Sequence, residues 1–159
     1  MRARPALLLL LALVIPGCGK PIDLKTALEV ANVSTGWFDM GVVEGKNKLV
    51  PSITFNFKNL GSETLSTLQA NVIFRRQGED EEWGNGFVRV AGSEGRKPGS
   101  TSQPVTVNSQ LGYTGTETRQ EMLQNSQFRD ARVQVFAKYG STQWTLIKEF
   151  PIERRLITK

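Results

Sequence analysis

Strict alternation of apolar and polar residues is the feature that most constrains the fold of this chain of 159 residues. In the segment 53–58, Ile53, Phe55 and Phe57 alternate with polar side chains. Successive side chains of a β-strand point to opposite faces, so this pattern predicts a strand with one buried face. The pattern returns at 68–74 after a polar turn. We therefore expect these two segments to form adjacent antiparallel strands.

Other segments of β character recur about every ten residues along the chain. They lie at 28–39, 86–90 and 105–107, and a hairpin at 131–150 turns at Gly140-Ser141. In this hairpin we expect Val133, Val135, Trp144 and Leu146 to point into the core. Residues 27–29 also fit a helical turn, and the stretch 92–102, which is rich in Gly, Ser, Lys and Pro, is expected to be a loop.

A single convincing helix is predicted, at Thr118-Arg119-Gln120-Glu121, where the spacing of Thr and Glu fits a capping box. About seven short strands, one short helix and no alternation of strands with helices indicate an all-β chain. We predict an immunoglobulin-like antiparallel β-sandwich, in which the apolar face of each sheet is buried against the other sheet. This domain is expected to span residues 27–159.

The amino-acid composition excludes several kinds of chemistry. The chain has no His and one Cys, so it lacks nucleophile–His systems and zinc sites that use two His residues. The acidic run at 79–82 lacks the spacing of a calcium loop, and no metal site is expected. Without Arg2 and Arg4, 18 basic residues stand against 15 acidic ones, and they are scattered. We therefore expect no enzyme, no cofactor and no nucleic-acid partner.

The first 18 residues have the order of a secretory signal. Two Arg residues precede ten apolar residues at 6–15, and Pro16-Gly17-Cys18 follows. A helix needs about 20 apolar residues to cross the hydrocarbon core of a bilayer, so this run is too short for a permanent membrane span.

The segment Ile15-Pro16-Gly17-Cys18 resembles the lipobox of bacterial lipoproteins, with an apolar residue three positions before the Cys and a small residue directly before it. The resemblance implies that the signal peptide at 1–17 is removed and that Cys18 carries acyl chains such as palmitate. Residues 18–26 would then form a tether, and the chain would be anchored to the inner or outer membrane of a bacterial cell envelope. An ordinary secretory signal with an incidental Cys is the alternative.

A second resemblance covers about residues 49–107. An alternating strand ends at Lys58-Asn59, a second one ends at Arg76, and Lys97-Pro98-Gly99-Ser100 precedes a later strand. This order resembles bacterial FxLYD-type and late-embryogenesis-abundant-type sandwich domains, although the Phe-x-Leu-Tyr-Asp string itself is missing. The resemblance implies a β-sandwich that serves as an accessory module. With the predicted anchor at Cys18, we expect this domain to project into the periplasm or outside the cell.

Aromatic residues beside glycines are the best candidates for a binding site. They occur in Trp83-Gly84-Asn85-Gly86-Phe87 and at Tyr113 within the segment 111–116. We predict that Trp83, Asn85, Phe87 and Tyr113 bind a protein or an envelope polymer through loops of the sandwich. In the alternative interpretation, these side chains only pack against the end of the core. A different function, that of a periplasmic carrier of a small apolar ligand, predicts a cavity between the sheets.

Overall fold

The structure is a computed structural model that describes residues 20–158, so the predicted signal peptide at 1–17 and the predicted lipidation site Cys18 lie outside the described residues. Its elements are α1 (Leu24–Ala27), β1 (Leu28–Val43), β2 (Lys46–Asn59), β3 (Gln69–Arg76), β4 (Gly84–Arg89), β5 (Val105–Asn108), β6 (Tyr113–Gly115), α2 (Arg119–Gln124), β7 (Ala131–Lys138), β8 (Thr145–Pro151) and β9 (Leu156–Ile157). The predicted all-β sandwich is confirmed, with nine strands among the described residues instead of about seven.

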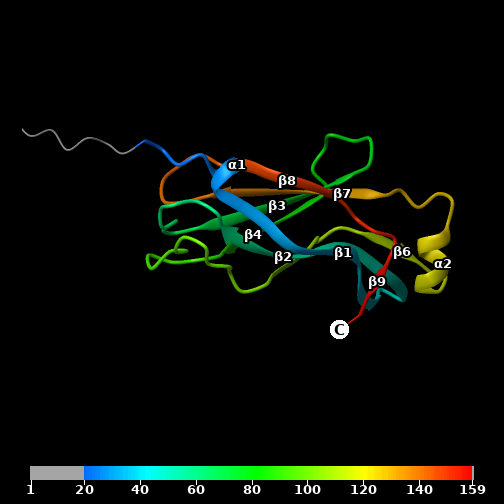
Figure 1. The fold of residues 1–159 in the computed structure, drawn as a ribbon. Coiled ribbons are helices and arrows are strands. Elements are labelled where there is room, and N and C mark those ends of the chain that lie inside the picture. Colours follow the sequence, from blue (N-terminus) through cyan, green and yellow to red (C-terminus); the bar gives the residue numbers. More distant parts are fainter. Residues whose placement is uncertain (1–19, 159) are drawn as a thin grey trace, which may run out of the picture.

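Two sheets face each other across the core (Figure 1). The first sheet has the strand order β5-β2-β1-β9, and β6 pairs with β2 beside β5. The second sheet has the order β4-β3-β7-β8. All pairs of neighbouring strands are antiparallel except β1 and β9, which are parallel.

The predicted pairing of the two alternating segments is wrong. The segment 53–58 belongs to β2 and the segment 68–74 belongs largely to β3, and these strands lie in opposite sheets. The edges of β2 are occupied by β1 on one side and by β5 and β6 on the other. Strands that pair side by side and strands that face each other bury the same alternate residues, so the alternation alone could not distinguish the two arrangements.

The predicted inward face of the last hairpin is correct for β7 and wrong for β8. Val133 and Val135 are fully buried, whereas Trp144 and Leu146 remain 37% and 36% exposed. Val135 pairs with Lys148 but the next residue, Phe136, pairs with Leu146, so the register shifts at this point. An extra residue in one strand turns the following side chains to the opposite face of the sheet, and the sequence carries no sign of this bulge.

The core is filled by side chains from the inner faces of both sheets. Its largest fully buried members are Trp37, Phe55, Phe57, Phe74, Leu49, Ile53, Leu65 and Leu68. The helix α2 has the predicted capping box: the Thr118 hydroxyl accepts a hydrogen bond from the Glu121 amide, and the Glu121 carboxylate accepts one from the Thr118 amide. Neither helix within residues 20–158 is long and apolar enough to cross a membrane.

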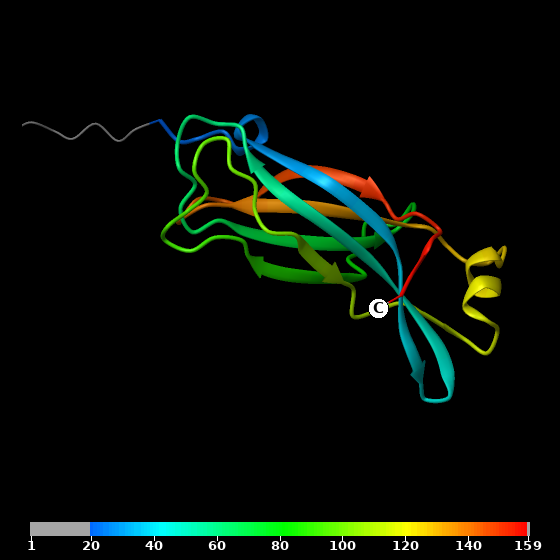
Figure 2. The same cartoon turned by 60° about the horizontal axis from the view of Figure 1, so that its bottom comes forward.

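The sandwich has two distinct ends. The described chain begins at one of them, beside α1, and we call this the α1 end (Figure 1). Three hydrogen bonds hold the neighbouring loops there. The main-chain amide of Ile22 donates to the Tyr139 hydroxyl. The main-chain amides of Leu60 and Gly140 donate to the main-chain oxygens of Ala27 and Ser66, respectively. α2 lies at the opposite end, the α2 end, and the hairpin of β1 and β2 projects from the sandwich on that side (Figure 2).

Candidate binding site

The four residues predicted to bind a partner lie in two separate places. Trp83 and Tyr113 come together at the α2 end, where their ring centroids are 5.0 Å apart. Asn85 and Phe87 lie on β4, on the outer face of the second sheet. Asn85 and Phe87 therefore belong to a strand and not to a loop at the end of the sandwich.

Trp83 and Tyr113 belong to an aromatic cluster that closes the α2 end of the core. Its other members are Trp37 on β1 and Phe128, which follows α2. Trp37 is fully buried and meets Phe128 edge to face with ring centroids 4.5 Å apart. The centroids of Tyr113 and Phe128 are 4.7 Å apart. Residues from four parts of the chain thus form one continuous aromatic wall.

Arg154 holds the loop that follows α2 in place. Its guanidinium donates hydrogen bonds to the main-chain oxygens of Leu123 and Phe128, at 3.1 and 2.7 Å, and to the carboxylate of Asp130. The guanidinium carbon also lies 5.2 Å from the centroid of the Phe128 ring, a cation–π arrangement. These contacts tie the loop after α2 to the segment between β8 and β9.

Tyr113 contributes a hydroxyl group to the same wall. Burial raises the pKa of this hydroxyl above its ordinary value, although the nearby positive charge of Arg76 opposes the shift. The neutral hydroxyl donates a hydrogen bond to the main-chain oxygen of Arg129 at 3.3 Å.

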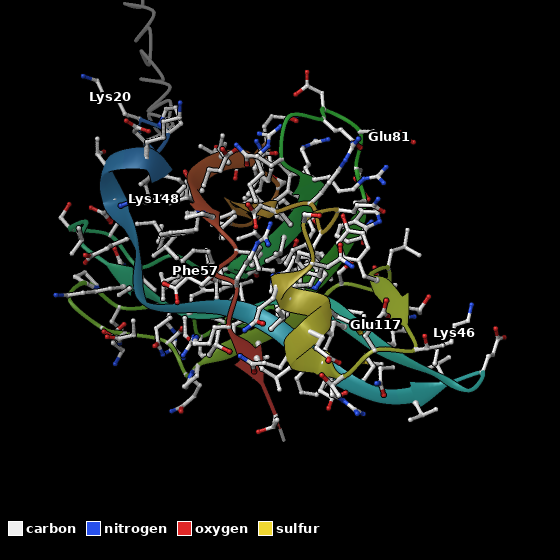
Figure 3. The ribbon with its side chains drawn as sticks, turned by 90° about the vertical axis from the view of Figure 1, so that its right-hand side faces the viewer. Lys20, Lys46, Phe57, Glu81, Glu117 and Lys148 are labelled. Carbon is white, nitrogen blue, oxygen red and sulfur yellow. The ribbon has the colours of Figure 1, made fainter. Side chains whose placement is uncertain are left out.

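An open pocket of about 230 Å³ lies beside the aromatic cluster, between β6 and α2. It is lined by Tyr113, Thr114, Gly115, Glu117, Met122, Asn125, Gln127 and Phe128. Two aromatic rings and a thioether supply its apolar surface, and one carboxylate and two amides supply its polar groups. Figure 3 looks onto this end and shows Glu117 beside α2. Among residues 20–158 there is no cluster of three or more side chains suited to a metal ion.

Glycines explain why Asn85 and Phe87 point outward. Gly84 and Gly86 face the first sheet, where an added Cβ would lie 2.1 Å from the Ser109 hydroxyl and 2.2 Å from a methyl group of Val107. The two sheets approach closely at this point, and only a residue without a side chain fits. The alternate positions face solvent, and Phe87 is 60% exposed.

Asn85 is held by polar neighbours on the outside of β4. Its side-chain amide donates to the carboxylate of Glu82. The side-chain oxygen of Gln110 accepts a hydrogen bond from the main-chain amide of Asn85 at 3.2 Å. The side-chain nitrogen of Gln110 donates one to the main-chain oxygen of Asn85 at 2.6 Å. Gln110 thus binds the main-chain groups of Asn85 at the free edge of β4. Another strand cannot pair with β4 at this position.

Two residues of the aromatic cluster, Trp37 and Phe128, were not predicted as site residues. Trp37 lies in a segment that reads simply as a strand. Phe128 is the only apolar residue in 124–130, and an isolated aromatic residue in a polar stretch is a signal that could have identified it. Their contact with Tyr113 depends on tertiary structure and has no local signature.

Comparison with solved structures finds similarity to the X-ray structure of the Northeast Structural Genomics Consortium target SoR45, with 17% identity and a TM-score of 0.47 over 82% of this chain and 89% of that chain. The chain is also similar to the crystal structure of a protein from Archaeoglobus fulgidus, with 14% identity and a TM-score of 0.31 over 79% of this chain and 98% of that chain. No protein-family model and no curated protein matches the chain.

Proposed function

We propose that the protein is a lipid-anchored, non-catalytic binding module of the bacterial cell envelope. In this proposal Cys18 carries the acyl chains, and the pocket at the α2 end contacts a protein or an envelope polymer. The observation that carries the proposal is the placement of the two ends: the described chain begins at the α1 end (Figure 1), and the pocket is lined by residues of β6 and α2, which lie at the α2 end. An anchor two residues before Lys20 leaves the pocket facing away from the membrane.

The chemistry of the pocket suits recognition of a flat group with polar substituents. Tyr113 and Phe128 offer ring surfaces, while Glu117, Asn125 and Gln127 offer hydrogen-bonding groups at the margin. Pockets for whole small molecules usually measure about 300–1,000 Å³. A pocket of about 230 Å³ is better matched to one aromatic side chain of a protein, or to one sugar ring of a polymer, than to a complete cofactor.

The alternative function, a carrier with a small apolar ligand between the sheets, has less support. Large side chains from both sheets, including Phe55, Phe57 and Phe74, are fully buried and belong to one continuous cluster. A pocket of about 270 Å³ lies at the α1 end, where Leu28 and Val30 of β1 approach Ile147 of β8. It is open and bordered by charged residues, whereas an apolar ligand favours an enclosed apolar space.

Intact mass of the membrane-extracted protein, with a Cys18→Ala variant beside it, tests the anchor. The expected mass is that of residues 18–159 plus acyl chains, and the variant is expected to lack the acyl chains. A soluble, unmodified product cut at another position contradicts the anchor and indicates a freely secreted module.

Photo-cross-linking in cells tests the binding end. A photo-reactive phenylalanine at Gln127, on the pocket, is expected to give a discrete adduct. The same group at Thr106, which is exposed on β5, serves as the control. Equal adducts from both positions, or none from either, would argue against the pocket as the contact site.

A further inference from the structure

Charge is divided unevenly between the two ends of the sandwich. The segments 20–29, 58–66, 89–102 and 138–148 contain eight Lys and Arg residues and four Asp and Glu residues, a net charge of +4. The rest of the described chain contains nine basic and eleven acidic residues, a net charge of −2. The four basic segments meet at the α1 end, since Gly99 donates to the Asn59 oxygen, Gly140 to Ser66, and Ile22 to Tyr139.

The cations of these four segments form no salt bridge among the described residues. Within residues 20–158, every salt bridge joins residues outside these four segments, such as Arg119 with Asp39 and Arg132 with Glu149. Arginines outside these segments are thus largely paired with carboxylates of the protein itself. At the α1 end, basic side chains such as Lys25, Lys138 and Lys148 form no such pair.

Exposed apolar side chains accompany these cations. Leu60, in the loop beside α1, is 54% exposed, and Trp144 is 37% exposed. The ring of Trp144 lies edge to face with that of Phe87, with centroids 6.1 Å apart, and the ammonium of Lys138 lies 5.0 Å from the Trp144 ring. Trp side chains favour the boundary between headgroups and acyl chains of a bilayer, and Lys side chains reach from there to phosphate groups.

We propose that the α1 end is a membrane-docking surface that binds anionic phospholipid headgroups through Lys25 and Lys138 and inserts Trp144 at the interface. This inference rests on the proposed anchor at Cys18, because two residues of chain span at most about 7 Å and would hold Lys20 at the headgroups. Basic residues beside an anchor add electrostatic attraction to the acyl chains, and the combination makes membrane binding stable.

A membrane fits these observations better than a second copy of the chain. Two α1 ends brought face to face would place a net charge of +4 against another +4, which is repulsive. An anionic headgroup layer is instead complementary in charge, and the described chain begins at this end of the sandwich (Figure 1).

Tryptophan quenching in the acylated full-length mature protein tests the proposal. The protein is placed in phosphatidylcholine vesicles with brominated acyl chains, with and without phosphatidylglycerol, and its acylation is checked by intact mass. We expect phosphatidylglycerol to increase quenching of Trp144. The Trp144→Phe variant retains Trp37 and Trp83, which lie at the α2 end, and is expected to lose the quenching.

Charge variants provide the matched comparison. Lys25→Gln with Lys138→Gln should abolish most of the increase caused by phosphatidylglycerol, because each basic residue near an anionic surface changes the binding constant by about fivefold. Lys46→Gln with Lys48→Gln, in the hairpin that projects near the α2 end, removes the same charge and should leave the quenching unchanged.

The outcomes separate the two proposals. A mass without acyl chains overturns the anchor and the docking surface with it. An acylated protein overturns the docking surface alone if Trp144 is not quenched, if Trp144→Phe keeps the quenching, or if both pairs of lysine variants behave alike.

Discussion

The side-chain amide of Asn59 donates a hydrogen bond to the main-chain oxygen of Arg96, 2.8 Å away, and so ties the end of β2 to a loop 37 residues further along the chain. The same amide donates to the Glu63 oxygen at 2.8 Å, and its carbonyl oxygen accepts from the Gly61 amide at 2.9 Å. Asn59 is fully buried. One side chain therefore satisfies three main-chain groups where two loops leave the sandwich.

Replacement of Asn59 is expected to destabilise the fold strongly. The Asn59→Ala variant leaves these main-chain groups without their partner, at a cost of about 2–3 kcal/mol in the free energy of unfolding. Asn59→Asp should cost at least as much, because it sets oxygen against the two carbonyl oxygens. Urea unfolding measures the change. Gln103→Ala, at an exposed position, is the control, and equal unfolding midpoints for Asn59→Ala and Gln103→Ala would disprove the role of Asn59.

Gly86 permits the close approach of the two sheets, and a Gly86→Ala substitution is expected to overpack the core. The new Cβ would lie 2.2 Å from a methyl group of Val107, whose branched side chain is 6% exposed and has little freedom to move. We expect a loss of about 1–3 kcal/mol in urea unfolding. Adding Val107→Ala should recover part of that loss. If the losses of unfolding free energy caused by Gly86→Ala and Val107→Ala simply add up in the double variant, Gly86 does not act through its contact with Val107.

Much of the fold could be predicted from local patterns. Alternation marks the strands because a sheet with one buried face imposes a period of two, and the Thr118–Glu121 spacing marks α2 because the cap is formed within one turn. The assignment of β2 and β3 to opposite sheets could not be predicted, because it depends on which strands occupy the edges of β2. The exposure of Trp144 depends on a bulge that the sequence does not mark.

The candidate site was only half predictable. The sequence identifies Trp83 and Tyr113 because aromatic residues beside glycines predict binding loops, but glycines do not always mark a loop. Gly84 and Gly86 instead reflect close packing against Ser109 and Val107. Trp37 and Phe128 reach the cluster only through the folding of β1 and the loop after α2, so no local pattern relates them to Tyr113.

The capping box of α2 should make stability depend on pH in the acidic range. Hydrogen bonds from the side chain and main chain of Thr118 lower the pKa of Glu121. Because the folded pKa lies below the unfolded one, the contribution is present above the unfolded pKa and is lost as the pH falls through the folded pKa. Glu121→Gln should therefore lose less stability than the native chain between pH 7 and pH 3.

Urea unfolding of both proteins at these two pH values checks the capping box. Thr118→Ala serves as a second variant, since loss of an N-cap costs about 1 kcal/mol at neutral pH. If the native chain and Glu121→Gln lose the same stability on acidification, the carboxylate does not support the helix.

Tyr113 should make stability depend on pH at the alkaline end of the range. Burial raises the pKa of its hydroxyl in the folded protein, so the folded state holds its proton at pH values where the unfolded chain has begun to release it. The contribution is present in full below the unfolded pKa and is lost as the pH rises through the folded pKa. Tyr113→Phe has no hydroxyl to ionise and should lose less stability than the native chain between pH 8 and pH 11.

Tyr139→Phe is the control for the effect of Tyr113 on the pH dependence of stability, because it removes a tyrosine hydroxyl at another place in the fold. Tyr139 also carries a hydrogen-bonded hydroxyl, which accepts from the Ile22 amide at the α1 end, far from the aromatic cluster. Urea unfolding at both pH values should give a flatter pH dependence for Tyr113→Phe than for Tyr139→Phe.

Because burial in the cluster is the cause, loosening the cluster should diminish the effect. Phe128→Leu opens one side of Tyr113, and the pH dependence of this variant should lie closer to that of Tyr113→Phe than the native chain's does. An unchanged pH dependence in Phe128→Leu would show that the Tyr113 hydroxyl is not held by this packing.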